Sequence, residues 1–375
     1  MSGYSVKSCV IEHPEDIEAE WLDLQNRVDC SYFQSWGWIG TWLNKIVTGH
    51  HTIVVRVWFD NTLVGMGVFV HKCITRRLII RSHALFLNEY PFDGRNMIIE
   101  YNGLLIDPSH QLAVYSQTLA HLFQTYRNCN ELFFSALRST SPIIQVAGQI
   151  KGVRLKTIDE SLSWSINLDE FKQGIDAYLA TLSKNRRAQI RRSFKLYEEH
   201  GSLQIDEACN AKAAQVFFDG LKELHTARWK SKGLPGSFSN PLWEAFHRTL
   251  IHSRFEKGEI QLLRVSVANQ DIGYLYNFIW RKHVYILQTG FKVSEDKRFM
   301  PGYVVHVMAV AYNKQKGMKI YDLMHGYSTY KSILCNQNQK LHWMVVQRSQ
   351  LKFRLEDIAV SIVRQYRHRD ETYPE

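Results

Sequence analysis

The chain has 375 residues, of which 45% are hydrophobic and 13% aromatic, so a disordered chain is excluded and about two globular domains are expected. The net charge of +10 favours an anionic partner without identifying it. No apolar run approaches the roughly 18 residues of a membrane helix, and the N-terminus lacks the basic-then-apolar pattern of a signal peptide. We therefore expect a cytoplasmic protein with no membrane span.

Metal chemistry and the common nucleotide or hydrolase motifs have no support in the sequence. The six cysteines are scattered singly, and no His-Glu-x-x-His, P-loop or Gly-x-Ser-x-Gly occurs. We expect no metal site and no permanently bound cofactor.

The first part of the chain alternates helical and strand patterns. Residues 14–48 predict two helices, with Ser35 as the cap of the second. Asp60-Asn61 predicts a hairpin turn. The other expected elements are strands at 52–59, 63–71, 77–87, 97–106 and 131–137, a polar loop at 88–94 and a helix at 108–127.

The same order of elements recurs later in the chain. A basic helix is expected at 178–200, followed by helices at 211–229 and 241–252. Strands are then expected at 260–268, 272–280 and 283–291, a helix at 301–316 and a strand at 319–323. Arg56-Val57, Asn61 and Gly65 have the same spacing as Arg264-Val265, Asn269 and Gly273. This repeat predicts a duplication, with domains at 1–165 and 166–375.

The end of the last predicted strand carries polar side chains able to move protons. Asp322 interrupts an apolar run, and an unpaired buried carboxylate is costly, so it needs a partner or a function. Tyr330 and Lys331 follow within one loop. We predict Asp322 as the base or orienting group, Tyr330 as the acid for the leaving group and Lys331 as a charge stabiliser. Ordinary packing and ion pairing are the alternative readings.

The basic helix has six cations and no acid between residues 184 and 195. Like charges so close repel each other, so we predict that Arg187 and Arg191 face an anionic ligand. Coenzyme A phosphates, tRNA and an acidic polymer all fit this pattern. A solvated positive face is the alternative.

Several motifs together resemble the GNAT acyltransferase superfamily, and more closely its double-domain branch, similar to the FemAB peptidyltransferases and the CelD-type acetyltransferases. They are Leu182-Ser183-Lys184-Asn185-Arg186-Arg187, His225-x-x-Arg228-Trp229, Pro301-Gly302 at a helix start, and Asp322-Leu323 followed by Gly326, Tyr330 and Lys331. The resemblance implies an α+β fold of two tandem GNAT-like modules, each a mixed, mostly antiparallel sheet flanked by helices.

The resemblance also implies a reaction. An acyl group passes from acyl-CoA, a cosubstrate, to an amine, hydroxyl or saccharide acceptor, as in cell-envelope or polysaccharide biosynthesis. Arg298, Pro301 and Gly302 would face the pyrophosphate of the donor, because helix N-termini bind anions. Tyr303 replaces the small residue usual at this loop, so aminoacyl-tRNA, the donor of some FemAB relatives, is an alternative to acyl-CoA. A non-catalytic binding protein of an envelope assembly is the third possibility.

The acceptor is expected at two places. His225, Arg228 and Trp229 lie at one helix end, where His225 and Arg228 share a face. Glu89 and Tyr90, after the third strand of the first module, would face the same cleft if the duplication holds. Helix capping and an ordinary turn are the alternatives.

Overall fold

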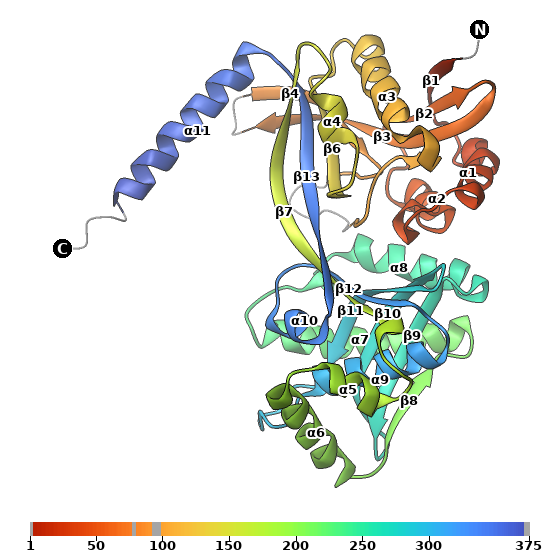
Figure 1. Cartoon of the computed structure of the whole chain (residues 1–375), viewed down its shortest axis with the longest axis vertical. Helices are drawn as coiled ribbons and strands as arrows, with labels where there is room; N and C mark the ends of the chain where they lie inside the picture. The colour runs from red at the N-terminus through yellow and green to blue at the C-terminus, as the bar shows by residue number, and fades with distance from the viewer. Residues whose placement is uncertain (1–2, 77–79, 92–98, 371–375) are drawn as a thin grey trace.

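The computed structural model describes the backbone of residues 3–76, 80–91 and 99–370, with side chains up to residue 360 (Figure 1). The elements of the first half are β1 (Tyr4–Val10), α1 (Glu15–Arg27), η1 (Tyr32–Gln34), α2 (Trp36–Lys45), β2 (Thr52–Phe59), β3 (Thr62–Arg76), β4 (Ile80–Leu87), β5 (Leu105–Ile106), η2 (Pro108–His110), α3 (Gln111–Thr125), β6 (Glu131–Arg138), α4 (Ile143–Ala147) and β7 (Val153–Asn167).

The elements of the second half are η3 (Leu168–Glu170), α5 (Ile175–Thr181), α6 (Lys184–Glu198), β8 (Leu203–Glu207), α7 (Ala211–Lys230), η4 (Ser237–Ser239), α8 (Pro241–Arg254), η5 (Phe255–Lys257), β9 (Ile260–Val267), β10 (Gln270–Trp280), β11 (His283–Phe291), α9 (Pro301–Gln315), β12 (Ile320–His325), α10 (Thr329–Leu334), β13 (Gln337–Arg348) and α11 (Leu351–Asp370). The α+β class with helices on a mostly antiparallel sheet is thus confirmed.

The two hairpins expected to be equivalent have the same geometry. Asp60 and Asn61 have φ of 47° and 67°, and Ala268 and Asn269 have φ of 48° and 60°. Positive φ at both central residues is the signature of the type I′ turn, whose twist matches that of the flanking strands. In the paired strands Val57 faces Gly65, and Val265 faces Gly273. The repeat seen in the sequence is therefore a repeat of backbone geometry.

The last strand of each half belongs to the sheet of the other half. The strand order is β1-β2-β3-β4-β6-β13-β7-β12-β11-β10-β9-β8, so β13 pairs with β6 of the first half and β7 pairs with β12 of the second. Figure 1 shows β7 and β13 running together between the two halves. One continuous sheet results, and the domain division at residue 165 stays a prediction.

Two expected elements differ from the structure, and two others lie partly outside the described residues. The strand at 97–106 is wrong: only Leu105–Ile106 (β5) is a strand, while 99–104 is irregular and 97–98 lies outside the described residues. The basic helix at 178–200 is two helices, because Leu182 and Ser183 are extended and Ser183 begins α6. In the strand at 77–87 and the loop at 88–94, residues 77–79 and 92–94 lie outside the described residues.

A shared core fixes how the halves sit against each other. Trp38 of α2 packs on Phe246 of α8, with ring centroids 5.0 Å apart, and on Phe278 of β10 at 5.8 Å. All three side chains are buried in one cluster that spans both halves. Within the described residues, no helix is long and apolar enough to cross a bilayer.

Candidate active site

The site forms where two parallel strands of the second half separate. β11 and β12 pair only from His283 to Tyr285 and from Ile320 to Asp322, and both strands continue beyond the last pair. A cavity of about 270 Å³ opens there, which we name the second-half slot. Its lining residues are Glu100, His225, Arg228, Trp229, Lys232, Ile286, Leu287, Gln288, Thr289, Leu323, Met324, His325, Tyr330 and Lys331.

Irregular backbone on both strands faces this slot. In β11 the register with β10 shifts at Leu287, which is left without a partner in that pairing. In β12 the register with β7 shifts between Asp322 and His325, and Met324 has φ of 66°. A bulge leaves its extra residue outside the ladder. In β12 the N–H groups of Met324 and His325 already donate to Asp322 and Glu100, so main-chain hydrogen bonds to a ligand are expected at the β11 bulge.

Asp322 is not a lining residue of the slot, but it connects the elements around the slot through hydrogen bonds. Its carboxylate is fully buried and accepts hydrogen bonds from Tyr101 Oη at 2.6 Å and from Met324 N at 2.7 Å. His283 Nε2 lies 3.0 Å away and Ser163 Oγ 3.5 Å away. These partners come from the 99–104 segment, β12, β11 and β7. A carboxylate with four partners and no face on the cavity fixes geometry, and its expected place as the base is not open to an acceptor.

Tyr330 and Lys331, both on α10, line the slot as expected. Burial raises the pKa of Tyr330, so its phenol stays protonated at neutral pH and can donate a proton. Its ring stacks on His306 with centroids 5.5 Å apart. Lys331 Nζ donates to the carbonyls of Met324 at 3.2 Å and His325 at 2.6 Å, so it supports the bulge of β12. Burial lowers the pKa of Lys331.

Glu100 and His325 form an acid–imidazole pair in the slot that the sequence analysis missed. Glu100 accepts from the backbone N–H of His325 at 2.8 Å, and its other oxygen is bonded to His325 Nδ1. The Glu100 side chain is 3% exposed and the His325 side chain 29%. The local signal for Glu100 was a carboxylate within an apolar run, Met97 to Ile106, but no local pattern links it to a histidine 225 positions later.

The first half has the same strand arrangement without the same chemistry. β4 and β6 pair in parallel from Ala84 to Phe86, and β6 carries a matching bulge at Ser135 and Ala136, where Ala136 has φ of 49°. Aligning the two bulges places Phe134 where the second half has Asp322, and Leu137 where it has His325. The proton-handling residues are therefore replaced by apolar ones in the first half.

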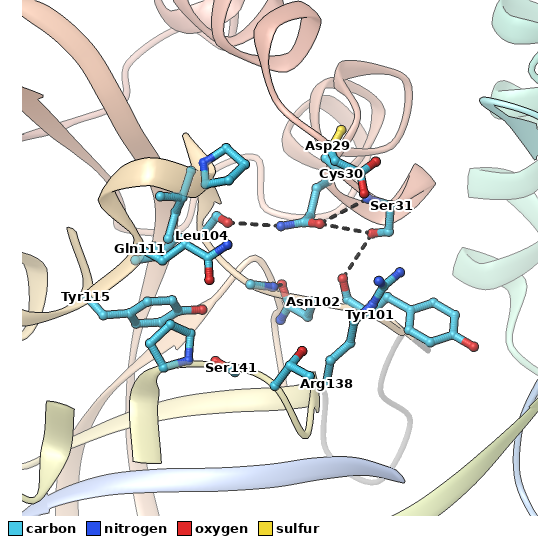
Figure 2. Close-up of a pocket in the computed structure, with 16 residues that line it drawn as sticks. Asp29, Cys30, Ser31, Tyr101, Asn102, Leu104, Gln111, Tyr115, Arg138 and Ser141 are labelled. Carbon is cyan, nitrogen blue, oxygen red and sulfur yellow. Dashed lines mark hydrogen bonds between the residues drawn. The ribbon is translucent and has the colours of Figure 1, made fainter. Parts of the chain in front are cut away.

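The chain itself occupies the gap between β4 and β6. Residues 99–104, here named the plug segment, place Asn102 in a parallel bridge with Leu137. The Asn102 amide donates to Leu87 O at 2.9 Å and accepts from Asn88 at 3.0 Å. Figure 2 shows Ser31 donating to Tyr101 O beside a separate cavity of about 260 Å³. This segment closes the first half and delivers Glu100 and Tyr101 to the second.

Comparison with known proteins agrees with this geometry. Residues 184–332 match the family model of the acetyltransferase (GNAT) domain. FemX is similar in structure over 93% of this chain and 99% of its own, with a TM-score of 0.61 and 11% identity. Residues 184–332 therefore carry a GNAT domain, and the whole chain has a FemX-like fold.

Two further solved structures share the fold of this GNAT protein. One is the C-terminal domain (DUF2156) of a putative lysylphosphatidylglycerol synthetase from Agrobacterium fabrum, with 10% identity, a TM-score of 0.54, and coverage of 93% of this chain and 95% of that one. The other is a conserved protein of unknown function from Bacteroides thetaiotaomicron, with 10% identity, a TM-score of 0.51, and coverage of 92% and 100%. None of the curated proteins matches the sequence.

The helix end expected to hold the acceptor does lie at the slot of the GNAT domain. His225 lies 3.2 Å from Thr289 O through Nδ1 and accepts from Ser237 N at 3.3 Å through Nε2. Both ring nitrogens are therefore used within the protein, and burial lowers the pKa of His225. The Arg228 guanidinium lies 5.8 Å from the centre of the Phe291 ring. Trp229 packs on His225 with centroids 5.7 Å apart.

The residues expected to bind donor phosphates are outside the lining of the slot. Pro301 and Gly302 begin α9, and a Cβ on Gly302 would lie 3.3 Å from the Phe291 ring, so this helix start is adjacent to the strand that bounds the slot. Arg298 is paired with Asp296 at 2.6 Å and holds the pKa of that carboxyl at about 2.

The two arginines of α6 also have partners within the protein. Arg187 donates to Ala180 O at 3.3 Å, and Arg191 is paired with Asp176 at 2.7 Å. Both contacts are on the surface. Contacts of this kind contribute little to stability, so an anionic ligand can replace the present partner of either arginine.

Glu89 and Tyr90 lie in the first half and are not brought to the slot. The buried Glu89 carboxyl accepts a hydrogen bond from Ser135, and burial raises its pKa to about 7. The Tyr90 ring packs on His50 with centroids 4.2 Å apart. Glu89 faces the bulge of β6, which is the first-half counterpart of the site.

Proposed function

We propose that this protein transfers an acyl group from acyl-CoA to an amine or hydroxyl acceptor in the second-half slot. The observation that carries the proposal is the separation of β11 and β12 beside bulged backbone and the start of α9. A thioester arm can lie between the separated strands and bond to peptide groups at the bulge of β11. The acyl carbonyl then meets the side chains at the base of the slot.

The slot provides the two functions that direct transfer needs. Unpaired backbone N–H groups at a bulge can stabilise the oxyanion of a tetrahedral intermediate. Tyr330, protonated because burial raises its pKa, can donate to the departing thiolate. No covalent acyl-enzyme is required, because no cysteine or serine lines the slot among the described residues.

Cations at the slot favour an anionic donor. Arg228 and Lys232 are both lining residues on or just after α7. Among the ion pairs found between the described residues, none includes either of these two cations. The nearby N-terminus of α9 adds peptide N–H groups that suit a pyrophosphate.

An aminoacyl-tRNA donor, as the FemAB resemblance implies, is the second candidate. The observation that favours it is α6, whose Lys184, Arg192 and Lys195 are exposed on a helix without acids before its last turn. Nucleic-acid binding of this kind weakens steeply with salt. Under this alternative the slot holds the aminoacyl end and α6 contacts the phosphate backbone.

A thermal-shift panel separates the donors. Acetyl-CoA, malonyl-CoA and a long-chain acyl-CoA are compared with deacylated tRNA at several salt concentrations. At 100 times its Kd a ligand stabilises the fold by about 2.7 kcal/mol, which is measurable as a shift in Tm. Arg228→Gln should reduce the shift by acyl-CoA, while Lys230→Gln, which removes the same charge two residues along α7 and away from the slot, should preserve it.

Each outcome of this panel has a meaning. Stabilisation by an acyl-CoA that Arg228→Gln weakens supports the proposal. Stabilisation by tRNA alone, lost at high salt, supports the second candidate. No shift with any of these ligands contradicts both and favours the non-catalytic binding protein.

A further inference from the structure

We propose that the His325 imidazole is the general base of the transfer and that Glu100, supplied by the first half of the chain, is its positioning residue. This inference rests on the proposed function and names the group that activates the acceptor. Glu100 lies outside the motifs that pointed to the fold, and His325 begins the loop that leads to Tyr330 and Lys331.

His325 lines the slot, and one of its ring nitrogens is held by Glu100. Glu100 bonds to His325 twice, through the backbone N–H at 2.8 Å and through Nδ1. The Trp343 ring packs against the imidazole with centroids 5.4 Å apart. Since Nδ1 is used by the carboxylate, the tautomer with a hydrogen on Nδ1 leaves the lone pair of Nε2 as the acceptor.

Two other acid–imidazole pairs among the described residues lack this access. His283 lies 3.0 Å from Asp322, whose oxygens are also bonded to Tyr101 and Met324. His342 lies 2.9 Å from Glu160, on β13 and β7. None of these four residues lines the slot. Access to the slot, rather than pairing alone, distinguishes Glu100 and His325.

The plug segment determines where Glu100 stands. Its backbone is fixed on one side by Ser31, which donates to Tyr101 O at 3.0 Å, and on the other by the Asn102 contacts with Leu87 and Asn88. Tyr101 has φ of 50°, a strained conformation for a bulky residue, and strain of this kind concentrates at functional sites. The plug segment therefore fills the gap between β4 and β6 in the first half and places the Glu100 carboxylate in the second-half slot.

The chemical step is direct aminolysis or alcoholysis of the thioester. The acceptor nitrogen or oxygen attacks the acyl carbon as His325 Nε2 takes its proton, and a C–N or C–O bond forms. The tetrahedral intermediate then collapses, the C–S bond breaks, and the thiolate takes the proton of Tyr330. The imidazolium loses its proton to solvent, and the Tyr330 phenolate recovers one, so the products are the acylated acceptor and free coenzyme A.

The charged groups that face the pair come from four elements. Lys331 of α10 bonds to the carbonyl of His325, and Arg228 and Lys232 lie across the slot. Asp322 precedes His325 on β12, and Tyr330 shares the lining.

The test uses the full-length protein and needs no knowledge of the natural acceptor. Diethyl pyrocarbonate modifies accessible imidazole nitrogens, and peptide mass spectrometry gives the rate at each histidine, with and without acetyl-CoA. In parallel, release of coenzyme A thiol from acetyl-CoA is followed from pH 5 to 9 with a panel of primary amines. The variants are His325→Gln and Glu100→Gln, with His342→Gln and Glu160→Gln as matched controls from a pair outside the slot.

We expect His325 to react faster than the buried His225 and His306, and acetyl-CoA to protect it. His325→Gln should lower thiol release by about 10²- to 10⁴-fold, the range for loss of general-base catalysis. Glu100→Gln should lower kcat more than it raises KM, which a purely structural role would not do. Both control variants should keep the wild-type profile.

Two contrary results are distinguishable. If acetyl-CoA binds and protects the slot but His325→Gln keeps wild-type thiol release, or His325 is no more reactive than buried histidines, the base assignment is overturned. If acetyl-CoA neither stabilises nor protects the wild-type protein, the proposed donor fails first.

Discussion

The Tyr101 hydroxyl donates a 2.6 Å hydrogen bond to Asp322, joining two residues that are 221 positions apart. Tyr101 belongs to the segment that closes the first half, and Asp322 to the strand that bounds the slot of the second. The bond therefore couples the closed half to the open one. It also explains why the Asp322 carboxylate, expected as the base, is buried and held outside the lining of the slot.

Tyr101→Phe tests this coupling. The change removes the hydroxyl bonded to Asp322 and Ser163 and keeps the ring. A hydrogen bond to a charged group contributes about 1.5–3 kcal/mol, so the free energy of unfolding should fall by about 2 kcal/mol in urea titrations. Tyr327→Phe, at a side chain that is 85% exposed, should have no measurable effect. If both variants have the same free energy of unfolding, the Tyr101–Asp322 hydrogen bond does not stabilise the contact between the halves.

Asp322→Asn should destabilise the fold as well as slow the reaction. The amide nitrogen is a donor, so it would face Tyr101 Oη and His283 on one side or Met324 N–H on the other. Removing one partner of a buried charged network costs on the order of 3 kcal/mol. The measurement is urea unfolding together with thiol release. A stable variant with unchanged turnover would contradict the positioning role.

The raised pKa of Glu89 predicts a pH-dependent loss of stability. Its pKa is about 7 in the folded protein because of burial, against an ordinary value near 4.5. The unfolded chain ionises first as pH rises, so stability falls between about pH 4.5 and 7 and is constant above. The loss is about 3 kcal/mol. From pH 5 to pH 8 the free energy of unfolding should therefore fall more in wild type than in Glu89→Gln. An identical pH dependence of the two proteins would refute this.

The duplicated glycines Gly65 and Gly273 predict equal effects in the two halves. A Cβ on Gly65 would lie 2.4 Å from Val114 of α3, and one on Gly273 would lie 2.7 Å from Val305 of α9. Overpacking a core contact costs about 1–3 kcal/mol. Gly65→Ala and Gly273→Ala should each lower Tm. Gly148→Ala, with its nearest contact at 3.7 Å, should not. A neutral result in one half only would argue against equivalent packing.

Local sequence patterns were enough for the repeated hairpins and the helices. The first hairpin turn, Asp60-Asn61, lies where it was predicted, whereas the second, expected at 269–271, lies one residue earlier at Ala268-Asn269. The pairing of the long strands β7 and β13 could not be predicted. Each of them pairs with a strand of the other half, and that partner lies far away in the chain. The break before α6 at Ser183 was missed because apolar residues at helical spacing, Leu179, Leu182 and Ile190, continue across it.

The candidate site, too, could be predicted only where it depends on local motifs. Tyr330, Lys331, Arg228 and Trp229 lie at the slot, as the motifs indicated. Glu100 could not be placed there from sequence, because its position depends on how residues 99–104 fill the gap beside β6. Phe134 and Leu137 explain why only one half has a candidate site, but this became visible only when the two bulges were aligned in space.

The most direct test of the central claim is amide hydrogen–deuterium exchange of the full-length protein with and without saturating acetyl-CoA. The account predicts slower exchange at residues 286–291, at 301–306 and at 323–326, and no change at 85–90 or 134–138. Protection at 85–90 and 134–138 in place of the second-half slot, or no protection anywhere, would contradict it.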